Sequence, residues 1–223
     1  MLSVKLTAVT SPYKEKIIQY LDECSLEVQE LQAVNTVILK NNKLYGYNTD
    51  IFGINFALQN IDLYNKSIAI LGAGGAARAI GYVLSRHAVQ LFWINRTPSK
   101  ALQLSQEFGG NVIAISKLSE IKIDIIVNTT TIGMYPNINE SPLPNYKFSK
   151  HQVVFDMIYN PYMTKLLQQA RHDQAQIISG IDMFISQGLK QIELFIESAI
   201  DIAEIIDQLR IIIIKNQESL NNS

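Results

Sequence analysis

Short apolar runs alternate with amphipathic segments through the middle of the chain, and the two kinds of segment have the lengths of strands and helices. The run Ile68–Leu71 is fully apolar, whereas Pro98–Phe108 mixes apolar and polar residues and has proline in its first turn. Strand–helix alternation of this kind builds a parallel sheet with helices on both faces. The expected strands are 68–71, 90–94, 123–127, 153–156 and 175–178, and the expected helices are 76–84, 98–108 and 164–171.

The two ends of the chain carry a different pattern, which indicates a second and smaller lobe. The elements expected there are a strand at 4–9, a helix over 13–32 that begins near Pro12, a strand at 34–39, a turn at Asn41-Asn42, a helix at 51–59, and helix from Gly180 to about Lys215. The predicted fold is therefore α/β. Residues 51–179 form a domain with a doubly wound parallel sheet, and residues 1–50 with 180–223 form a smaller α/β lobe.

Composition and charge indicate which kinds of partner and which cellular compartment to expect. The 223 residues are 48% hydrophobic, so the chain can bury a sizeable core, and the net charge of −1 suggests neither a nucleic-acid nor a membrane partner. The single cysteine, Cys24, permits no internal disulfide and fits a reducing compartment. The longest purely aliphatic run, Ile211–Ile214, is far too short to span a membrane, and residues 1–8 show no signal-peptide pattern. We therefore expect a cytoplasmic protein.

The most specific local signal is a glycine cluster, Gly72-Ala-Gly-Gly-Ala-Ala77, between an expected strand and an expected helix. In a dinucleotide-binding turn, the first glycine permits the tight turn, Gly74 lets the backbone approach a pyrophosphate, and a small residue at 77 allows close helix–strand packing. The helix N-terminus offers unpaired N–H groups to the phosphates. The alternative is a plain turn that uses glycine for packing. The cluster predicts a Rossmann-type domain that binds a dinucleotide through Gly72, Gly74, Gly75 and Ala76.

The residues after the next expected strand predict which dinucleotide is bound. NAD-binding proteins place an Asp or Glu about 20 residues past the first glycine, where it binds the ribose 2′-OH. Here the strand ends in Asn95-Arg96-Thr97, with Lys100 one turn on and no acidic residue at this point. Arg96 can bind a 2′-phosphate and stack on the adenine, Thr97 can donate its hydroxyl, and Lys100 adds positive charge. We therefore expect NADP, the alternative being an ordinary solvated basic turn.

Candidates for acid–base chemistry are few. None of His87, His151 and His172 lies in a motif, which disfavours dehydrogenases with a histidine proton donor, and no group of residues has metal-ligand spacing. Reduction of a carbonyl needs a proton source beside the hydride donor, and the remaining candidates are Lys14 and Asp50. From the residues alone, the lysine could equally lie on the surface at a helix start, and the aspartate could cap the helix at 51–59.

Eight motifs, in this order along residues 8–190, resemble those of the shikimate dehydrogenase family. TSPYKE at 10–15 is similar to the family's V-T-x-P-x-K segment, AVNT at 33–36 to A-V-N-T, and GYNTDIFG at 46–53 to G-x-N-T-D-x-x-G. The other motifs are the glycine cluster and the segments 95–97, 128–134, 156–164 and 180–188. Agreement on this scale is very improbable by chance, and it is the resemblance, not the composition, that names a substrate.

The resemblance implies a two-lobe enzyme that uses NADPH to reduce 3-dehydroshikimate reversibly to shikimate in the cleft between its lobes. It implies that Lys14 is catalytic with Asp50 as its partner, and an ammonium and a carboxylate within about 4–6 Å do support each other's charged forms. The residues implied to line the substrate pocket are Thr10, Asn35, Tyr159 and Gln187. Those implied at the cofactor, beyond the glycine cluster and the basic turn, are Thr129, Gly133, Met134 and Gly180.

The chain also departs from the family's pattern. The family usually has a few tens of residues before the first motif, including a serine pair that binds the substrate carboxylate, and no such pair stands in this sequence. We therefore expect a truncated substrate lobe with an exposed edge strand, and a monomer or a homodimer formed through such an edge. The alternatives to a shikimate dehydrogenase are a related quinate or polyol dehydrogenase and an NADP-binding protein with weak catalysis.

Overall fold

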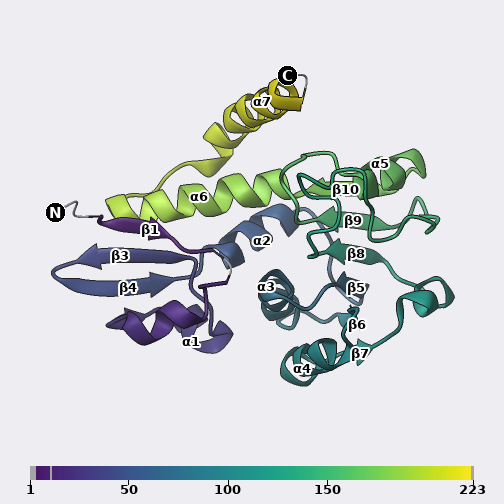
Figure 1. The fold of residues 1–223 in the computed structure, drawn as a ribbon, viewed down its shortest axis with the longest axis horizontal. Coiled ribbons are helices and arrows are strands. Elements are labelled where there is room, and N and C mark those ends of the chain that lie inside the picture. The colour runs from purple at the N-terminus through teal and green to yellow at the C-terminus, as the bar shows by residue number, and fades with distance from the viewer. Residues whose placement is uncertain (1–3, 11, 222–223) are drawn as a thin grey trace.

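The computed structural model describes residues 4–10 and 12–221, which form two β-sheets connected by long helices (Figure 1). The larger sheet has six strands, all parallel, in the order β10-β9-β8-β5-β6-β7. Counted along the chain, this is the 3-2-1-4-5-6 order of a doubly wound nucleotide-binding sheet, so the predicted Rossmann-type fold is confirmed. The strands are β5 Ser67–Leu71, β6 Gln90–Ile94, β7 Asn111–Val112, β8 Ile125–Asn128, β9 Val153–Asp156 and β10 Gln176–Ser179.

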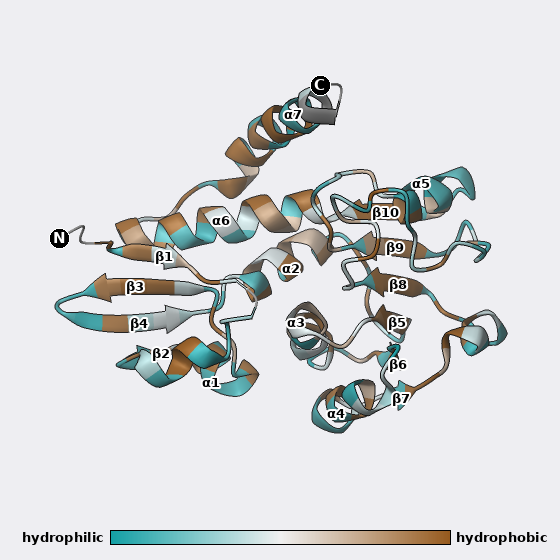
Figure 2. Ribbon diagram, in the orientation of Figure 1, coloured by the Kyte–Doolittle hydropathy of each residue, from teal (hydrophilic) through white to brown (hydrophobic). Residues whose placement is uncertain are grey.

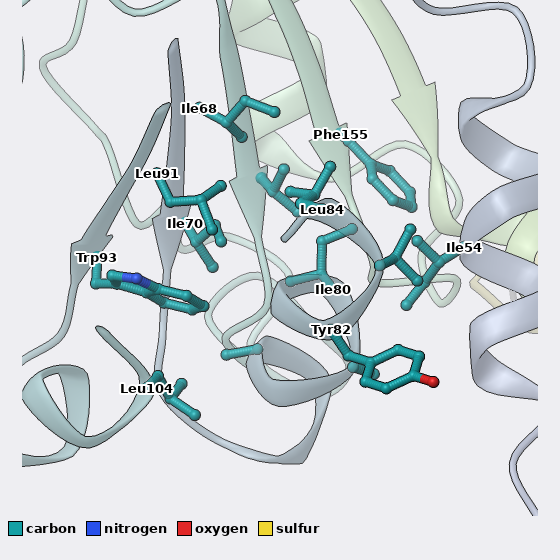
Figure 3. Close-up of a cluster of buried hydrophobic side chains, with 14 of the residues drawn as sticks. Ile54, Ile68, Ile70, Ile80, Tyr82, Leu84, Leu91, Trp93, Leu104 and Phe155 are labelled. Atoms are coloured by element: carbon teal, nitrogen blue, oxygen red, sulfur yellow. The ribbon is translucent and has the colours of Figure 1, made fainter. Parts of the chain in front are cut away.

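Each face of the six-stranded sheet is covered by helices and has its own buried core. The covering elements are α3 Gly75–Leu84, α4 Pro98–Phe108, the 3-10 helix η2 Ile115–Glu120, and α5 Lys165–His172. Because successive strand residues point to opposite faces, Ile68 and Ile70 pack with Trp93 and with α3 and α4 (Figure 3). Ala69 and Leu71 pack on the other face with η2 and α5. A parallel sheet covered on both faces presents the carboxyl ends of its strands to a ligand.

The smaller sheet has four strands in the order β1-β3-β4-β2, and β1 lies at one edge. Its strands are β1 Leu6–Ala8, β2 Glu23–Cys24, β3 Thr36–Lys40 and β4 Lys43–Tyr47. β3 pairs antiparallel with both β1 and β4, whereas β2 pairs parallel with β4. The predicted turn Asn41-Asn42 joins β3 to β4, and both of its residues have positive φ, 51° and 59°, as a type I′ hairpin turn requires.

The helix predicted over 13–32 is wrong. The structure has the 3-10 helix η1 (Lys16–Tyr20), strand β2 and helix α1 (Leu26–Leu31) in its place. The N–H of Asp22 donates to the Leu44 carbonyl oxygen (2.9 Å), and its carboxylate accepts from the Leu44 N–H (2.7 Å). Pairing with the neighbouring strand satisfies these backbone groups and overrides the local helical pattern.

Two helices link the sheets: α2 (Asp50–Leu58) and α6 (Gly180–Ile196). α2 follows β4 and leads to β5, whereas α6 follows β10 and reaches the β3–β4 hairpin, where Glu197 pairs with Lys40 (Figure 1). The two helices approach closely at Gly53, where a Cβ would lie 2.6 Å from the Met183 carbonyl oxygen. This contact joins the two parts of the molecule.

The chain is helical over most of the range predicted from residue 180 to about 215, but the helix is interrupted: α6 ends at Ile196, and its C-cap Glu197 has a left-handed φ of 55°. A separate helix, α7 (Ile202–Asn221), then packs Ile202 and Ile206 against α6. Apolar and polar residues alternate along α7 (Figure 2). Within residues 4–10 and 12–221, no helix is both long enough and apolar enough to cross a membrane.

Candidate active site

The strand register brings distant predicted residues to one end of the four-stranded sheet. Ala8 at the end of β1 is paired with Thr36 at the start of β3, which is paired with Tyr47 at the end of β4. The segments that carry Lys14, Asn35 and Asp50 therefore emerge from the same end of the sheet, and a Val34 N–H···O bond of 2.8 Å to the Lys14 carbonyl joins two of them. The arrowheads of β8 and β9 point toward this sheet (Figure 1).

Lys14 and Asp50 form an ion pair at this end. The Lys14 Nζ lies 2.5 Å from Asp50 Oδ2, and the two side chains are 27% and 17% exposed. Asp50 lies in the first turn of α2, where the helix dipole favours a carboxylate. The alternative that Asp50 caps this helix is wrong, because Thr49 occupies the N-cap position. The alternative of a freely solvated surface lysine is wrong as well, since the ammonium is bound to Asp50 and the side chain is only partly exposed.

The amide of Asn35 is the centre of a buried polar network. Its Nδ2 donates to Asp50 Oδ1 (2.8 Å) and to Thr49 Oγ1 (3.0 Å). Its Oδ1 accepts from Thr36 Oγ1 (2.7 Å) and from the Thr49 N–H (2.8 Å). With 3% of its surface exposed and both ends of the amide bonded, Asn35 is built to hold the carboxylate of Asp50 in place.

Sequence reasoning did not single out the residues that complete this network. Asn48 Nδ2 donates to the Ala33 carbonyl oxygen (2.9 Å), and Asn48 Oδ1 accepts from the Asp50 N–H (3.1 Å). Thr36 and Thr49 bond to Asn35 as described. All three stand inside motifs that were recognised in the sequence, and their polar character at nearly fully buried positions is the signal that could have identified them.

Helix α6 brings Gln187 to the same network. Its Oε1 lies 3.4 Å from both Asn35 Nδ2 and Thr49 Oγ1, and its Nε2 donates to the Phe184 carbonyl oxygen (2.9 Å). The ring of Phe184 stacks on the ring of Tyr159, with centroids 4.0 Å apart and an angle of 11° between planes. Tyr159 is 42% exposed and follows β9. Thr10 is exposed too, and its carbonyl oxygen accepts from the Tyr13 N–H (2.9 Å).

The glycine cluster forms the turn between β5 and α3. Gly72 has a φ of 111°, and a Cβ there would lie 2.4 Å from Thr129 Oγ1, so no other residue fits without strain. Thr129, after the adjacent strand β8, donates its hydroxyl to the Leu71 carbonyl oxygen (2.7 Å). A Cβ at Gly74 or Gly75 would meet nothing within 4 Å. These two glycines and the partly exposed Ala76 therefore open α3 with free space in front of the backbone, as a diphosphate cradle requires.

The basic turn after β6 lies beside the glycine turn, because β6 is the parallel neighbour of β5 and the Gly72 N–H donates to the Ile94 carbonyl oxygen (2.8 Å). Asn95 Nδ2 donates to the Thr97 carbonyl oxygen (2.9 Å), and Thr97 is the N-cap of α4. Arg96 and Lys100 are exposed, and neither forms an ion pair with any residue that the structure describes. Both cations are thus available to an anionic ligand.

The remaining predicted cofactor residues differ in how far they are exposed. Met134 is 38% exposed in the loop after β8. Gly133, with a φ of 94°, and Gly180 are buried. A Cβ at Gly180 would lie 2.5 Å from the Met157 carbonyl oxygen, so close backbone packing at the start of α6 accounts for this glycine, and its cofactor contact stays a prediction.

One buried carboxyl group was not singled out from the sequence. Asp156 ends β9 and is fully buried, and burial raises its pKa from 3.8 to about 6 against the opposing effect of its hydrogen bonds. Oδ2 accepts from Thr164 Oγ1 (2.7 Å), and Oδ1 accepts from Asn128 Nδ2 (3.0 Å) and from the Ile158 N–H (3.1 Å). These neutral donors fix the loops after β8 and β9, which hold Met134 and Tyr159.

The structure offers other chemistry little support. In the described part of the chain, no three His, Cys, Asp or Glu residues gather as metal ligands, and His87, His151 and His172 are exposed. A depression of about 340 Å³ lies between the end of α2 and the turn that contains His87, and none of the predicted site residues lines it. The predicted site residues lie instead toward the facing ends of the two sheets.

Two protein families match this chain. The family described as Shikimate dehydrogenase substrate binding domain matches residues 3–37, and Shikimate / quinate 5-dehydrogenase matches residues 55–161. A Shikimate dehydrogenase (NADP(+)) from Bacillus cereus is 42% identical over 197 residues, which cover 84% of this chain and 71% of that protein. The protein of the same name from Clostridium perfringens is 37% identical over 198 residues, which cover 87% and 73%.

Solved structures of a shikimate dehydrogenase and of a quinate dehydrogenase superpose on this chain. The shikimate 5-dehydrogenase of Thermus thermophilus, in complex with NADP(H) and shikimate, superposes with a TM-score of 0.84 at 30% identity, over 97% of this chain and 80% of that one. The quinate dehydrogenase of Corynebacterium glutamicum, in complex with NAD, superposes with a TM-score of 0.79 at 27% identity, over 93% and 78%.

Proposed function

The chain belongs to the shikimate dehydrogenase family, and from this premise we propose that it is an NADP-dependent oxidoreductase that interconverts 3-dehydroshikimate and shikimate. The observation that carries the proposal is the Lys14–Asp50 ion pair at 2.5 Å. It lies at the end of the four-stranded sheet toward which the carboxyl ends of β8 and β9 point (Figure 1). The position of this pair supports a role in proton transfer, because it lies opposite the edge at which doubly wound sheets bind dinucleotides.

The residues of the six-stranded sheet fit NADP. The diphosphate would lie on the open turn at Gly74 and Gly75 and at the N-terminus of α3. The 2′-phosphate would be bound by the hydroxyl of Thr97 and by the cationic groups of Arg96 and Lys100, which have no carboxylate partner in the described structure. When bound as NADPH, the cofactor supplies the hydride.

Reduction of a ketone adds a hydride to carbon and a proton to oxygen. The ammonium of Lys14 has three N–H donors, and Asp50 takes one of them, so the others can bind the substrate oxygen and deliver the proton. The partial exposure of Lys14 lets water return the proton. In the reverse direction the same nitrogen accepts the hydroxyl proton as hydride leaves the carbon.

Asp50 keeps the ammonium in position and presents its carboxylate to a substrate hydroxyl. The Asn35 network holds that carboxylate from behind, and Gln187 borders it from α6. Thr10 and Tyr159 are exposed and are proposed to contact the ring substituents of the substrate. In this assignment residues 1–50 with 180–223 form the substrate lobe, and residues 51–179 form the cofactor domain.

A Lys14→Met variant tests the proposal, because methionine keeps the aliphatic stem and removes the ammonium. We expect the rate of NADP⁺ reduction with shikimate to fall by about 10²–10⁴, while NADPH binding, followed by its fluorescence, stays unchanged. Lys16→Met is the matched control, since Lys16 is exposed two positions away and outside the network. Turnover near the wild-type rate in Lys14→Met would remove the catalytic assignment.

The substrate itself needs a separate test, because the matched family includes quinate dehydrogenases and one of the similar structures is a quinate dehydrogenase. Initial rates with shikimate and with quinate, each at saturating NADP⁺, compare the two. We expect shikimate to have the higher kcat/KM. A higher value for quinate would reassign the substrate and leave the Lys14–Asp50 chemistry in place.

A further inference from the structure

The last helix of the chain reaches the loop that carries Tyr159. Arg210 on α7 binds Asp182 on α6 through two bonds, Nε to Oδ1 (2.7 Å) and Nη2 to Oδ2 (3.0 Å). Ile206, about one turn earlier, is buried against α6. Gln217 follows Arg210 by about two helical turns, so it lies on the same packed face of α7. The ion pair and Ile206 thus hold α7 against α6 along the face that also carries Gln217.

Both ends of the Gln217 amide are bound by one short loop. Its Nε2 donates to the Tyr159 carbonyl oxygen (2.8 Å), and its Oε1 accepts from the Tyr162 N–H (2.9 Å). Gln217 is 9% exposed. A buried amide on the packed face of a helix is costly unless it is hydrogen-bonded, and packing alone would be served better by an apolar residue. Gln217 therefore serves as a two-point clamp on the backbone of residues 159–162.

This loop determines where the Tyr159 ring lies. The ring stacks on Phe184. The backbone that carries it is held by Gln217 at residues 159 and 162, by the Ser179 hydroxyl, which donates to the Tyr162 carbonyl oxygen (2.8 Å), and by the Tyr135 N–H, which donates to the Asn160 carbonyl oxygen (3.1 Å). No hydrogen bond joins the Tyr159 hydroxyl to another residue within 4–10 and 12–221. The direction of the hydroxyl consequently depends on the stack and on these backbone bonds, and Gln217 makes the bond at residue 159 itself.

We propose that Gln217 is a positioning residue for the substrate site: it acts through Tyr159, and α7 is thereby part of the apparatus that binds shikimate. The proposal rests on the proposed function, in which Tyr159 contacts the substrate. Gln217 itself touches neither substrate nor cofactor. Its removal loosens the backbone at residues 159–162 and lets the Tyr159 ring leave its place.

Two variants of Gln217 test the clamp. Gln217→Met keeps the length of the side chain and removes both bonds, whereas Gln217→Glu keeps the acceptor for the Tyr162 N–H and loses the donor to Tyr159. We expect Gln217→Met to raise KM for shikimate about three- to tenfold, which corresponds to one or two lost hydrogen bonds. Gln217→Glu should raise it at least as much, because its carboxylate would face the Tyr159 carbonyl oxygen without a cationic partner. KM for NADP⁺ should change by less than about twofold. Gln208→Met is the control, because Gln208 is exposed on the same helix.

A double-mutant cycle separates positioning from a general structural role. If Gln217 acts through Tyr159, then in a Tyr159→Ala background Gln217→Met has no further effect on KM for shikimate. An equal effect in both backgrounds would overturn the proposal, as would an unchanged KM in Gln217→Met when Tyr159→Ala raises it. Parallel losses for shikimate and NADP⁺ would overturn it too.

Amide hydrogen exchange provides a readout that needs no turnover. We expect the Tyr162 amide to lose protection in Gln217→Met and to keep it in Gln208→Met. Unchanged protection in Gln217→Met would overturn the clamp, whatever the kinetics. A wild-type chain that cannot reduce NADP⁺ with shikimate would overturn the proposed function and the substrate role of Gln217 with it, and the exchange data would still decide whether the loop is clamped.

Discussion

The facing ends of the two sheets are built on opposite principles. At the end of the four-stranded sheet, side chains satisfy one another: Lys14, Asp50 and Asn35 are joined by ion pairing and hydrogen bonds between groups that are largely covered. At the edge of the six-stranded sheet, the backbone is left open at Gly74, and Arg96 carries its charge unpaired among the described residues. In the proposed function, the first region is preorganised for chemistry, whereas the second is kept free for a ligand that brings its own negative charge.

Two carboxyl groups show the same contrast in electrostatic terms. Asp50 is next to an ammonium. Asp156, at the edge of the six-stranded sheet, accepts only from neutral donors, and burial raises its pKa to about 6. A buried carboxylate with a cationic partner is held ready to act, whereas one without such a partner is costly when ionised. We therefore expect that replacing the Asp50 carboxylate lowers activity, and that the Asp156 carboxyl group can be replaced by a neutral residue.

Of the changes that test this contrast between the two regions, the largest effect should come from Asp50→Asn, which leaves Lys14 without a counter-charge and keeps the acceptor for Asn35. We expect kcat with shikimate to fall by about 10²–10³, with NADPH affinity unchanged, and steady-state kinetics with fluorescence titration would measure both. Asp62→Asn, at an aspartate whose side chain is 74% exposed, is the control. A kcat within about threefold of wild type would show that the network is structural rather than catalytic.

A smaller and more selective effect is expected at the other region. Arg96→Ala should weaken NADP⁺ binding about 10- to 100-fold, because charge-assisted hydrogen bonds to the 2′-phosphate are worth roughly 1.5–3 kcal/mol. Affinity for NAD⁺, which has no such phosphate, should stay the same, and so should kcat at saturating NADP⁺. Calorimetric titration of both dinucleotides measures the selectivity, with the exposed Arg171→Ala as control. Equal weakening of both would contradict the assignment.

The smallest effect concerns stability and its pH dependence at Asp156. The folded protein holds this proton more tightly than the unfolded chain, so stability from this group falls as pH rises from 3.8 through about 6. Asp156→Asn should therefore gain stability relative to wild type by roughly 1–3 kcal/mol between about pH 4 and pH 7. Urea unfolding at each pH measures the difference.

A control of opposite sign is available at Asp173. A hydrogen bond from the Phe148 N–H lowers the pKa of this carboxyl group, helped by His172. Its contribution to stability is present above its unfolded pKa and is lost as the pH falls. Asp173→Asn should therefore lose stability relative to wild type as the pH rises. A pH-independent difference for Asp156→Asn would show that its carboxyl group has no raised pKa.

The six-stranded sheet could be predicted from the sequence much better than the four-stranded one. β6, α4 and β9 have the bounds expected from apolar runs and from proline at a helix start, because buried parallel strands are apolar on both faces. The helix prediction for residues 13–32 was wrong because their conformation depends on the hydrogen bonds between Asp22 and Leu44. A local sequence pattern does not contain such a contact. The two-residue strand β7 is polar at Asn111 and gave no signal.

The candidate site could also be predicted only where its residues are close together in the sequence. The glycine and basic turns are local in sequence, so their spacing alone was enough to predict a role for them, which stays a prediction. Lys14 and Asp50 are far apart along the chain, and only the family resemblance suggested that they meet. The bonds made by Asn48 and Thr49, the raised pKa of Asp156 and the reach of Gln217 all arise from three-dimensional packing.

The contact between α2 and α6 limits how two related proteins of this family can be joined into a chimera. The chain leaves the four-stranded sheet through α2 and comes back through α6, and the two helices meet at Gly53, where a side chain has no room. A chimera spliced at a single point would combine an α2 and an α6 from different parents and mismatch them at this crossing. Exchange of substrate preference between relatives therefore requires both helices to be inherited together, as one block.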